Sequence, residues 1–267
     1  MSKKTIGLAL SGGGARGFAH VGVLKALADN GIKINYVAGT SAGAFVGGAF
    51  AAGMSADEII KIGDGFNWFR ISGLSYSPRG LLSNARMKTF IDSHFPCATF
   101  DDLKIPFAAV ACDLETGEEV ILNGGGELST AIRASCAIPG VFMPVDGGGK
   151  LLIDGGVVSP VPINAIRKFD PDIVIAVDLM ACGASFWGRP RTLLGTLFQS
   201  AMMLLRSASR NQHYAADVVI EPRIAHIRPD QMSKVNELFE LGRAAAQEKI
   251  GEIKKLLDDH QNARPSV

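Results

Sequence analysis

The sequence predicts an α/β fold in which parallel strands form most of a central sheet. Two short apolar runs, TIGLAL at residues 5–10 and NYVAG at residues 35–39, have the length and composition of buried strands. A helical pattern follows the first run, and a segment rich in Ala and Gly, which permits close helix packing, follows Ser41. Strand, helix, strand and helix in this order predict a parallel α/β unit.

The first helix is predicted over residues 15–31, where apolar side chains recur at helical spacing and Gly31 stands where a helix commonly ends. The apolar positions of this helix are Phe18, Val21, Leu24 and Leu27. Residues 64–82 then mix aromatic residues, Gly and Pro without any period, which indicates a surface loop or a lid.

The rest of the chain continues to alternate between the two patterns. Helices are predicted over residues 85–95, 127–139, 192–212 and 231–259, strands within 105–125, 141–156 and 216–222, and a helix followed by a strand within 162–179. No repeat or change of composition divides the chain, so one domain over residues 1–267 is expected. Its motifs lie in a core of about residues 5–180, and a helical part covers about residues 190–260.

Composition restricts the class of protein. The chain is 47% apolar and 20% charged, which is typical of globular proteins, and its net charge of +1 argues against nucleic-acid binding. The four cysteines show no C-x-x-C spacing, which indicates free thiols in a reducing compartment, so a cytoplasmic protein is expected. Residues 34–56 carry no charge, but their glycines and polar residues favour a strand, a turn and a helix over a membrane span.

The glycine-rich segment SGGGARG, residues 11–17, lies between the first strand and the first helix and has more than one interpretation. Gly12, Gly14 and Gly17 match G-x-G-x-x-G, the dinucleotide-binding fingerprint. That fingerprint needs an acidic residue at the end of the second strand, whereas this strand runs directly into Ser41. A dinucleotide-binding enzyme is therefore the less favoured interpretation.

The same glycines also suit an oxyanion hole. Consecutive glycines at a helix start leave backbone N–H groups unpaired, and without side chains they let a substrate approach closely. Such donors stabilise the negative oxygen of a tetrahedral acyl intermediate. A plain tight turn that allows close helix packing is the third interpretation, and the segment alone does not decide between them.

Residues 39–43, GTSAG, match G-x-S-x-G, the nucleophile elbow that exposes a serine hydroxyl between a strand and a helix. The serine needs a base to take its proton. His213 and His226 fit the hydrolase order of serine, acid and histidine, but neither lies in a glycine-rich loop after a strand. Asp154, in LLIDGG, and Asp178, in VIAVDL, each end an apolar run, so these patterns leave the base open.

Taken together, these motifs resemble those of the patatin-like phospholipase family, in particular its small bacterial members. The match comprises the G-G-G-x-R-G loop at residues 12–17, G-x-S-x-G at residues 39–43 and D-G-G at residues 154–156, in the family's order. The segment ASCAIPGVFMPV, residues 134–145, is similar to the family's block before the acidic residue.

The resemblance implies a three-layer α/β/α sandwich and a carboxylic ester hydrolase that cleaves lipid acyl esters through an acyl-enzyme, without metal or cofactor. It implies a Ser–Asp dyad, with Ser41 as nucleophile and Asp154 as base, and gives Arg16 a role in loop support or head-group contact. It also implies oxyanion donors at Gly12, Gly13 and Gly14, and structural motif glycines at Gly17, Gly39, Gly43, Gly155 and Gly156. The implied partners are an acyl ester substrate and, transiently, a membrane surface.

A Ser–Asp dyad makes a physical demand. An aspartate in water has a pKa of about 3.9 and is a weak base, so the two side chains must touch in a pocket poor in water. Apolar side chains that could line an acyl channel, although core packing explains them equally well, are Phe66, Trp68, Phe69, Leu74, Tyr76, Met202, Met203, Leu204 and Leu205. A non-catalytic lipid- or partner-binding protein on the same fold is the alternative function.

Overall fold

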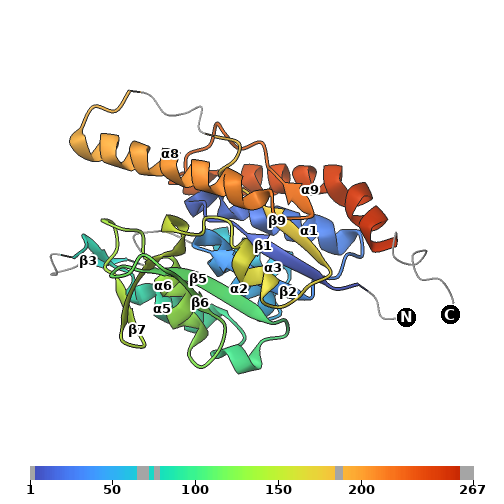
Figure 1. Ribbon diagram of the computed structural model, residues 1–267, viewed down its shortest axis with the longest axis horizontal. Helices are drawn as coiled ribbons and strands as arrows, with labels where there is room; N and C mark the ends of the chain where they lie inside the picture. Colours follow the sequence, from blue (N-terminus) through green and yellow to red (C-terminus); the bar gives the residue numbers. More distant parts are fainter. Residues whose placement is uncertain (1–3, 65–71, 75–78, 184–188, 259–267) are drawn as a thin grey trace.

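The computed structural model describes residues 4–64, 72–74, 79–183 and 189–258 of the chain. Within these residues an eight-stranded sheet lies between helices on both of its faces (Figure 1). The strands are β1 (Ile6–Leu10), β2 (Tyr36–Thr40), β5 (Phe107–Asp113), β6 (Glu119–Leu122), β7 (Val145–Gly147), β8 (Lys150–Asp154), β9 (Ile173–Val177) and β10 (Val218–Ile220), with a separate pair formed by β3 (Gly73–Leu74) and β4 (Leu82–Ser83).

The helices are α1 (Phe18–Asp29), α2 (Ala42–Ala51), α3 (Ala56–Asp64), α5 (Ala85–His94), α6 (Leu128–Ser135), α7 (Ile163–Arg167), α8 (Leu193–His213) and α9 (Val235–Asp258). Short 3₁₀ turns cover η1 (Gly14–Gly17), η2 (Phe100–Asp102), η3 (Gly155–Val157) and η4 (Met232–Lys234). None of the helices in this part of the chain is both long enough and apolar enough to cross a lipid bilayer.

The sheet buries side chains on both faces, which gives three layers. Leu8 and Leu10 of β1 belong to the large core under α1, α2 and α9, whereas Ala9 between them belongs to the smaller core under α7. This alternation follows from the two-residue period of a strand. The small residues on the α7 side let that short helix lie close to the sheet.

Five strands run parallel in the order β10, β9, β1, β2 and β5, and antiparallel strands extend the sheet beyond them. The predicted three-layer α/β fold with a mostly parallel sheet is thus confirmed. Loops that follow parallel strands gather at the carboxyl ends of the strands, which is where open α/β sheets place their sites. The glycine-rich segment follows β1 and Ser41 follows β2, so both lie at the carboxyl ends of the parallel strands.

The antiparallel strands bring a third segment to the same place. Residues Ala109 to Cys112 of β5 pair with β6 on one edge, while β2 pairs with β5 up to Val110 and β8 pairs with it from Ala111 onwards. Because β6 occupies one edge of β5, β2 and β8 must share the other. They run in opposite directions and meet end to end, Thr40 opposite Val110 and Asp154 opposite Ala111.

Three local expectations were wrong or incomplete. The first helix does not begin at residue 15 as an α-helix, since a 3₁₀ turn covers Gly14–Gly17 and α1 starts at Phe18. The last α-helix starts at Val235 rather than residue 231. The sequence patterns did not assign α3, a nine-residue helix beside the irregular stretch. Within residues 64–82, the aromatic residues Phe66, Trp68, Phe69 and Tyr76 lie outside the described residues.

Candidate active site

Ser41 lies at the sharp turn between β2 and α2. Its backbone has φ 55° and ψ −120°, a conformation that non-glycine residues rarely adopt and that costs about 1–3 kcal/mol. Two hydrogen bonds hold the turn: the Ser41 N–H donates to Oγ of Ser135 over 2.8 Å, and the Cys136 thiol donates to the Ser41 carbonyl over 3.2 Å. Ser135 in turn donates to the carbonyl of Val110 over 2.6 Å, which ties the turn to β5.

Two motif glycines are required by close backbone contacts at this turn. A Cβ on Gly43 would lie 2.1 Å from the carbonyl oxygen of Leu10, so α2 can approach β1 only where a side chain is absent. A Cβ on Gly155 would lie 2.2 Å from the carbonyl oxygen of Val110. Gly155 therefore lets the chain after Asp154 pass directly over β5.

Asp154 ends β8 at the point where this strand meets the end of β2. Its side chain is buried, with 7% exposed, and it accepts a hydrogen bond from the N–H of Gly156 over 2.8 Å. The Ser41 hydroxyl lies close enough to this carboxyl group to lower its pKa. The structure thus brings together the two side chains that the family resemblance pairs, although 113 positions of sequence separate them.

Burial disfavours the charged form of Asp154. Desolvation raises the pKa of this carboxyl group from 3.8 to about 6, against the opposing effects of the Ser41 hydroxyl and of the hydrogen bond from Gly156. The same burial, with the nearby charge of Asp154, raises the pKa of the Cys136 thiol well above its ordinary value. At neutral pH Asp154 is therefore ionised and more basic than a solvated aspartate, while Cys136 remains a thiol.

The raised pKa predicts a stability change with pH. Between pH 3.8 and about 6 the unfolded chain has lost the Asp154 proton and the folded chain has kept it, so stability falls as pH rises. Above pH 6 the full cost applies, about 3 kcal/mol for a shift of this size. We expect Asp154→Asn to raise the melting temperature at pH 8 and to leave it nearly unchanged at pH 4. Thermal unfolding at the two pH values measures this, and equal shifts at both would contradict it.

The glycine-rich loop lies against Ser41: a Cβ on Gly12 would be 3.5 Å from that of Ser41. The Gly12 N–H donates to the carbonyl of Pro160 over 3.0 Å, so it is not available to a substrate. The N–H groups of Gly13 and Gly14 have no backbone partner within the described residues. Of the three glycines predicted to donate to an oxyanion, Gly13 and Gly14 therefore keep an N–H group that has no backbone partner among the described residues.

His20 supports this loop from α1. Its Nε2–H donates to the carbonyl of Ser11 over 2.8 Å, and its side chain is fully buried. Desolvation lowers the pKa of His20 to about 4, against the raising effects of that hydrogen bond and of the Asp178 charge, so the ring is neutral at pH 7.

Arg16 also supports the loop. Its guanidinium is buried and donates to the carbonyls of Ile227, Leu179 and Gly183 over 2.8, 3.3 and 3.3 Å. Desolvation lowers the pKa of Arg16 from its ordinary value. These contacts tie the loop to the chain after β9, which favours loop support over head-group contact.

The other candidate bases have different partners. His213 is buried and its Nδ1 lies 3.0 Å from Oδ2 of Asp178, whose Oδ1 accepts from the N–H groups of Met180 and Ala181. His226 is largely exposed and bonds to Glu237. Among the described residues, none of the histidines hydrogen bonds to Ser41 or Asp154. His260 lies outside them.

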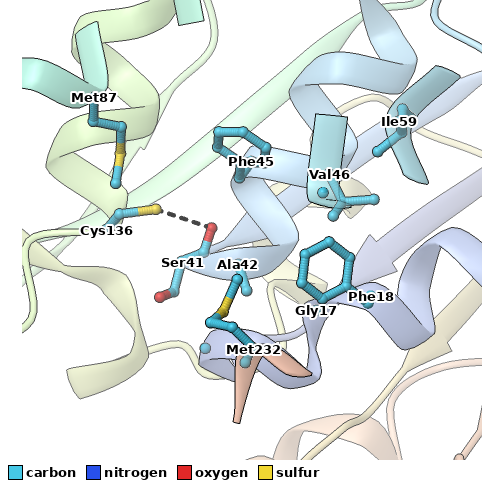
Figure 2. A pocket seen from close by; sticks show the side chains of 13 residues that line it. Gly17, Phe18, Ser41, Ala42, Phe45, Val46, Ile59, Met87, Cys136 and Met232 are labelled. Carbon is cyan, nitrogen blue, oxygen red and sulfur yellow. Dashed lines mark hydrogen bonds between the residues drawn. The ribbon is translucent and has the colours of Figure 1, made fainter. Parts of the chain in front are cut away.

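A largely apolar pocket opens beside Ser41. It has an empty volume of about 560 Å³, including space open to solvent. Figure 2 shows Phe18, Phe45 and Val46 on one side of Ser41 and Met87 and Cys136 on the other, with Met232 closing the lower side. The remaining lining residues are Gly14, Ala15, Gly17, Ala42, Ile59 and Gly63. A pocket of this kind, with few polar groups near a hydroxyl, suits an acyl chain.

Comparison with known proteins decides the family. A family model described as patatin-like phospholipase matches residues 8–166, which is more than half of the chain. The chain belongs to the patatin-like phospholipase family. The matched segment contains the glycine-rich loop, Ser41 and Asp154, so the site described above lies in the family's defining region.

Curated relatives agree with this assignment. An uncharacterised NTE family protein of Mycobacterium tuberculosis is 40% identical over 181 residues, which cover 67% of this chain and 50% of the relative. A protein of Yarrowia lipolytica named lysophospholipase NTE1 is 30% identical over 185 residues, covering 67% of this chain and 13% of the relative. The chain spans about half the length, or less, of the curated relatives it matches.

Two solved structures share the fold of this patatin-like chain. VipD from Legionella pneumophila aligns over 97% of this chain and 67% of its own, with a TM-score of 0.61 and 15% identity. The effector ExoU from Pseudomonas aeruginosa, in its complex with SpcU, aligns over 96% of this chain and 53% of its own, with a TM-score of 0.52 and 16% identity. At this level of identity the likeness concerns the fold alone.

Proposed function

We propose that this chain is a serine lipid acyl hydrolase of the carboxylic ester hydrolase type, with Ser41 as nucleophile and Asp154 as its base. The observation that carries the proposal is the burial of Asp154 beside the Ser41 hydroxyl, at a strained turn next to an apolar pocket. A nucleophile placed beside a base in a pocket shielded from water is the arrangement that nucleophilic catalysis requires.

In the proposed first step, Asp154 accepts the Ser41 proton while Oγ forms a bond to the carbonyl carbon of the ester. The tetrahedral intermediate then expels the alcohol, which takes the proton from Asp154, and an acyl-Ser41 ester remains. In the second step Asp154 takes a proton from water, the resulting hydroxide attacks the acyl carbon, and Ser41 recovers its proton as the acid leaves. No further group is needed to balance either step.

The N–H groups of Gly13 and Gly14 are the proposed donors to the oxyanion. They lie in the loop against Ser41, and their lack of other backbone partners among the described residues leaves them free for this role. One such donor typically contributes 10²–10³-fold in rate. The hydrogen bonds of His20 and Arg16 keep the loop in place and so support the donors indirectly.

The proposed substrate class is a lipid acyl ester: a phospholipid, a lysophospholipid or a neutral ester. The apolar lining of the pocket beside Ser41 supports an acyl chain there. The family description and a relative named as a lysophospholipase point to the same class. We further propose a cytoplasmic protein that acts peripherally, in transient contact with a membrane surface.

A fluorophosphonate probe tests this proposal directly. We expect stoichiometric labelling of Ser41, located by peptide mass spectrometry, and loss of both labelling and lipid hydrolysis in Ser41→Ala. Ser135→Ala is the matched control for a nearby serine, and it should weaken labelling without abolishing it. An unlabelled but folded wild-type protein that binds lipid would instead support the non-catalytic alternative.

A further inference from the structure

Helix α8 exposes apolar side chains to an unusual degree. Eight large apolar residues are exposed in the described part of the chain, and four of them lie in the first twelve residues of this one helix. They are Leu193, Leu197, Met203 and Leu204, with exposed fractions of 76, 58, 62 and 72%. Such a concentration marks an interaction surface rather than scattered surface residues.

The exposed leucines lie on one line of the helix. At about 100° per residue, Leu193, Leu197 and Leu204 fall within about 40° of one another. The same line continues to Ser207 and Asn211, which are also exposed but polar. Exposed Ser200 also lies on this line, so the outward face is largely apolar over residues 193–204 and polar beyond them.

The change from apolar to polar coincides with the place where α8 becomes attached to the rest of the fold. Ser209 and His213 hydrogen bond to Asp178, and the Gln212 side chain bonds to the backbone of Val158 and Val161. In Figure 1, α8 runs along the upper side of the molecule, and its amino-terminal end reaches away from the sheet. The apolar stripe thus occupies the projecting half of a helix that is anchored at its other end.

The segment of sequence that carries the stripe has only positive charges. From residue 179 to residue 216 the sequence has four arginines and no acidic residue, although the whole chain carries a net charge of only +1. Arg189 and Arg191, just before α8, and Arg210 on it are exposed. Exposed leucines flanked by arginines are the composition of helices that lie in the interface of an anionic membrane.

The helix that carries the stripe packs next to the proposed catalytic site through its neighbouring residue Leu205. A Cβ on Gly156 would be 3.8 Å from Cδ2 of Leu205, which follows Leu204 in α8, and Gly156 donates a hydrogen bond to Asp154. Val157, the next residue, is 48% exposed. A surface that covers the stripe would therefore meet the molecule close to Ser41 and Asp154.

From this combination we infer that the face formed by Leu193, Leu197, Met203 and Leu204 docks onto an anionic lipid surface and brings the bilayer to the active site. This inference rests on the proposed function, because it names the surface from which that site draws its substrate. Apolar burial supplies the affinity, and the arginines select for negative head groups.

Vesicle co-sedimentation tests the inference in the Ser41→Ala background, so that no lipid is consumed. The variant is Leu193→Gln with Leu197→Gln and Leu204→Gln, and the control is Leu114→Gln, an exposed leucine in the turn after β5 (47% exposed). With vesicles of phosphatidylcholine and phosphatidylglycerol, the triple variant should partition at least about tenfold less than the parent, and the control should match the parent. Vesicles of phosphatidylcholine alone should bind the parent more weakly.

Two further measurements separate the outcomes. With Ser41 intact, the triple variant should hydrolyse a water-soluble ester at the wild-type rate but lose activity on vesicles. Equal vesicle binding by parent and triple variant would overturn the inference, and so would a parent dimer that becomes a monomer in the variant without binding vesicles. Vesicle binding by a wild-type protein that hydrolyses no ester would overturn the proposed function and leave the docking surface in place.

Discussion

Asp154→Asn should lower kcat/KM for ester hydrolysis by at least about 10³-fold at pH 8. The amide keeps the shape of the side chain and can still accept from the Gly156 N–H, but it cannot take the proton of Ser41. In the wild type, the base works only when ionised, so kcat/KM should rise with pH through about 6 and then level off. Initial rates with a soluble ester between pH 4.5 and 8.5 measure both effects.

Histidine variants provide the control for this result. His226→Ala removes an exposed imidazole that pairs with Glu237 and should change kcat/KM by less than about threefold. His213→Ala removes a partner of buried Asp178, so it should lower stability more than it lowers activity per folded molecule. A 10³-fold loss in either folded histidine variant, with Asp154→Asn still active, would restore a histidine triad.

Gly155→Ala should have the largest effect on folding of the substitutions considered. The new Cβ would stand 2.2 Å from the Val110 carbonyl oxygen, so β8 would have to move away from β5. A loss of at least about 3 kcal/mol in the free energy of unfolding is expected, which lowers the melting temperature by roughly 6–12 °C for a chain of this size. Any protein that still folds should label poorly with fluorophosphonate, because Asp154 would move with the strand.

Gly124→Ala is the matched control for this substitution. A Cβ at Gly124 meets nothing within 4 Å, and its φ lies outside the left-handed region, so the change should shift the free energy of unfolding by no more than about 0.5 kcal/mol. Melting curves and denaturant titrations of the two variants, measured side by side, make the comparison. Similar curves for both variants would show that the Gly155 contact with β5 is not as close as described.

Much of the fold could be predicted because its strands are short apolar runs bounded by glycine, and its long helices have clear apolar periods. The strand–helix–strand–helix opening and the position of Ser41 followed from these patterns alone. Helix α3 was missed because it has only nine residues and borders an irregular stretch. The antiparallel placement of β8 beside β2 was also out of reach, since register across β5 is fixed by pairing and not by composition.

The site was predictable only where a motif marks it. Ser41 and Asp154 were paired through family resemblance, whereas spacing alone left Asp178 and two histidines as competitors. Ser135 and Cys136, which hold the elbow, lie in a recognisable segment but carry no signal of their contact with Ser41. Met232 lines the pocket from the carboxyl-terminal part of the chain, beyond the family match, where no motif could indicate it.

Strands β2 and β8 meet end to end on one edge of β5. The distance between Ser41 and Asp154 therefore does not depend on the number of residues between the two strands. What fixes the distance from hydroxyl to carboxylate is the pairing of Thr40 with Val110 and of Asp154 with Ala111. Ser135 and Cys136 also hold the Ser41 turn, whereas the turns at residues 114–118 and 147–149 do not enter that geometry. Evolution can therefore lengthen, shorten or decorate them to suit a new lipid, while a slip of a single position in either pairing would turn one of the two groups to the opposite side of the sheet.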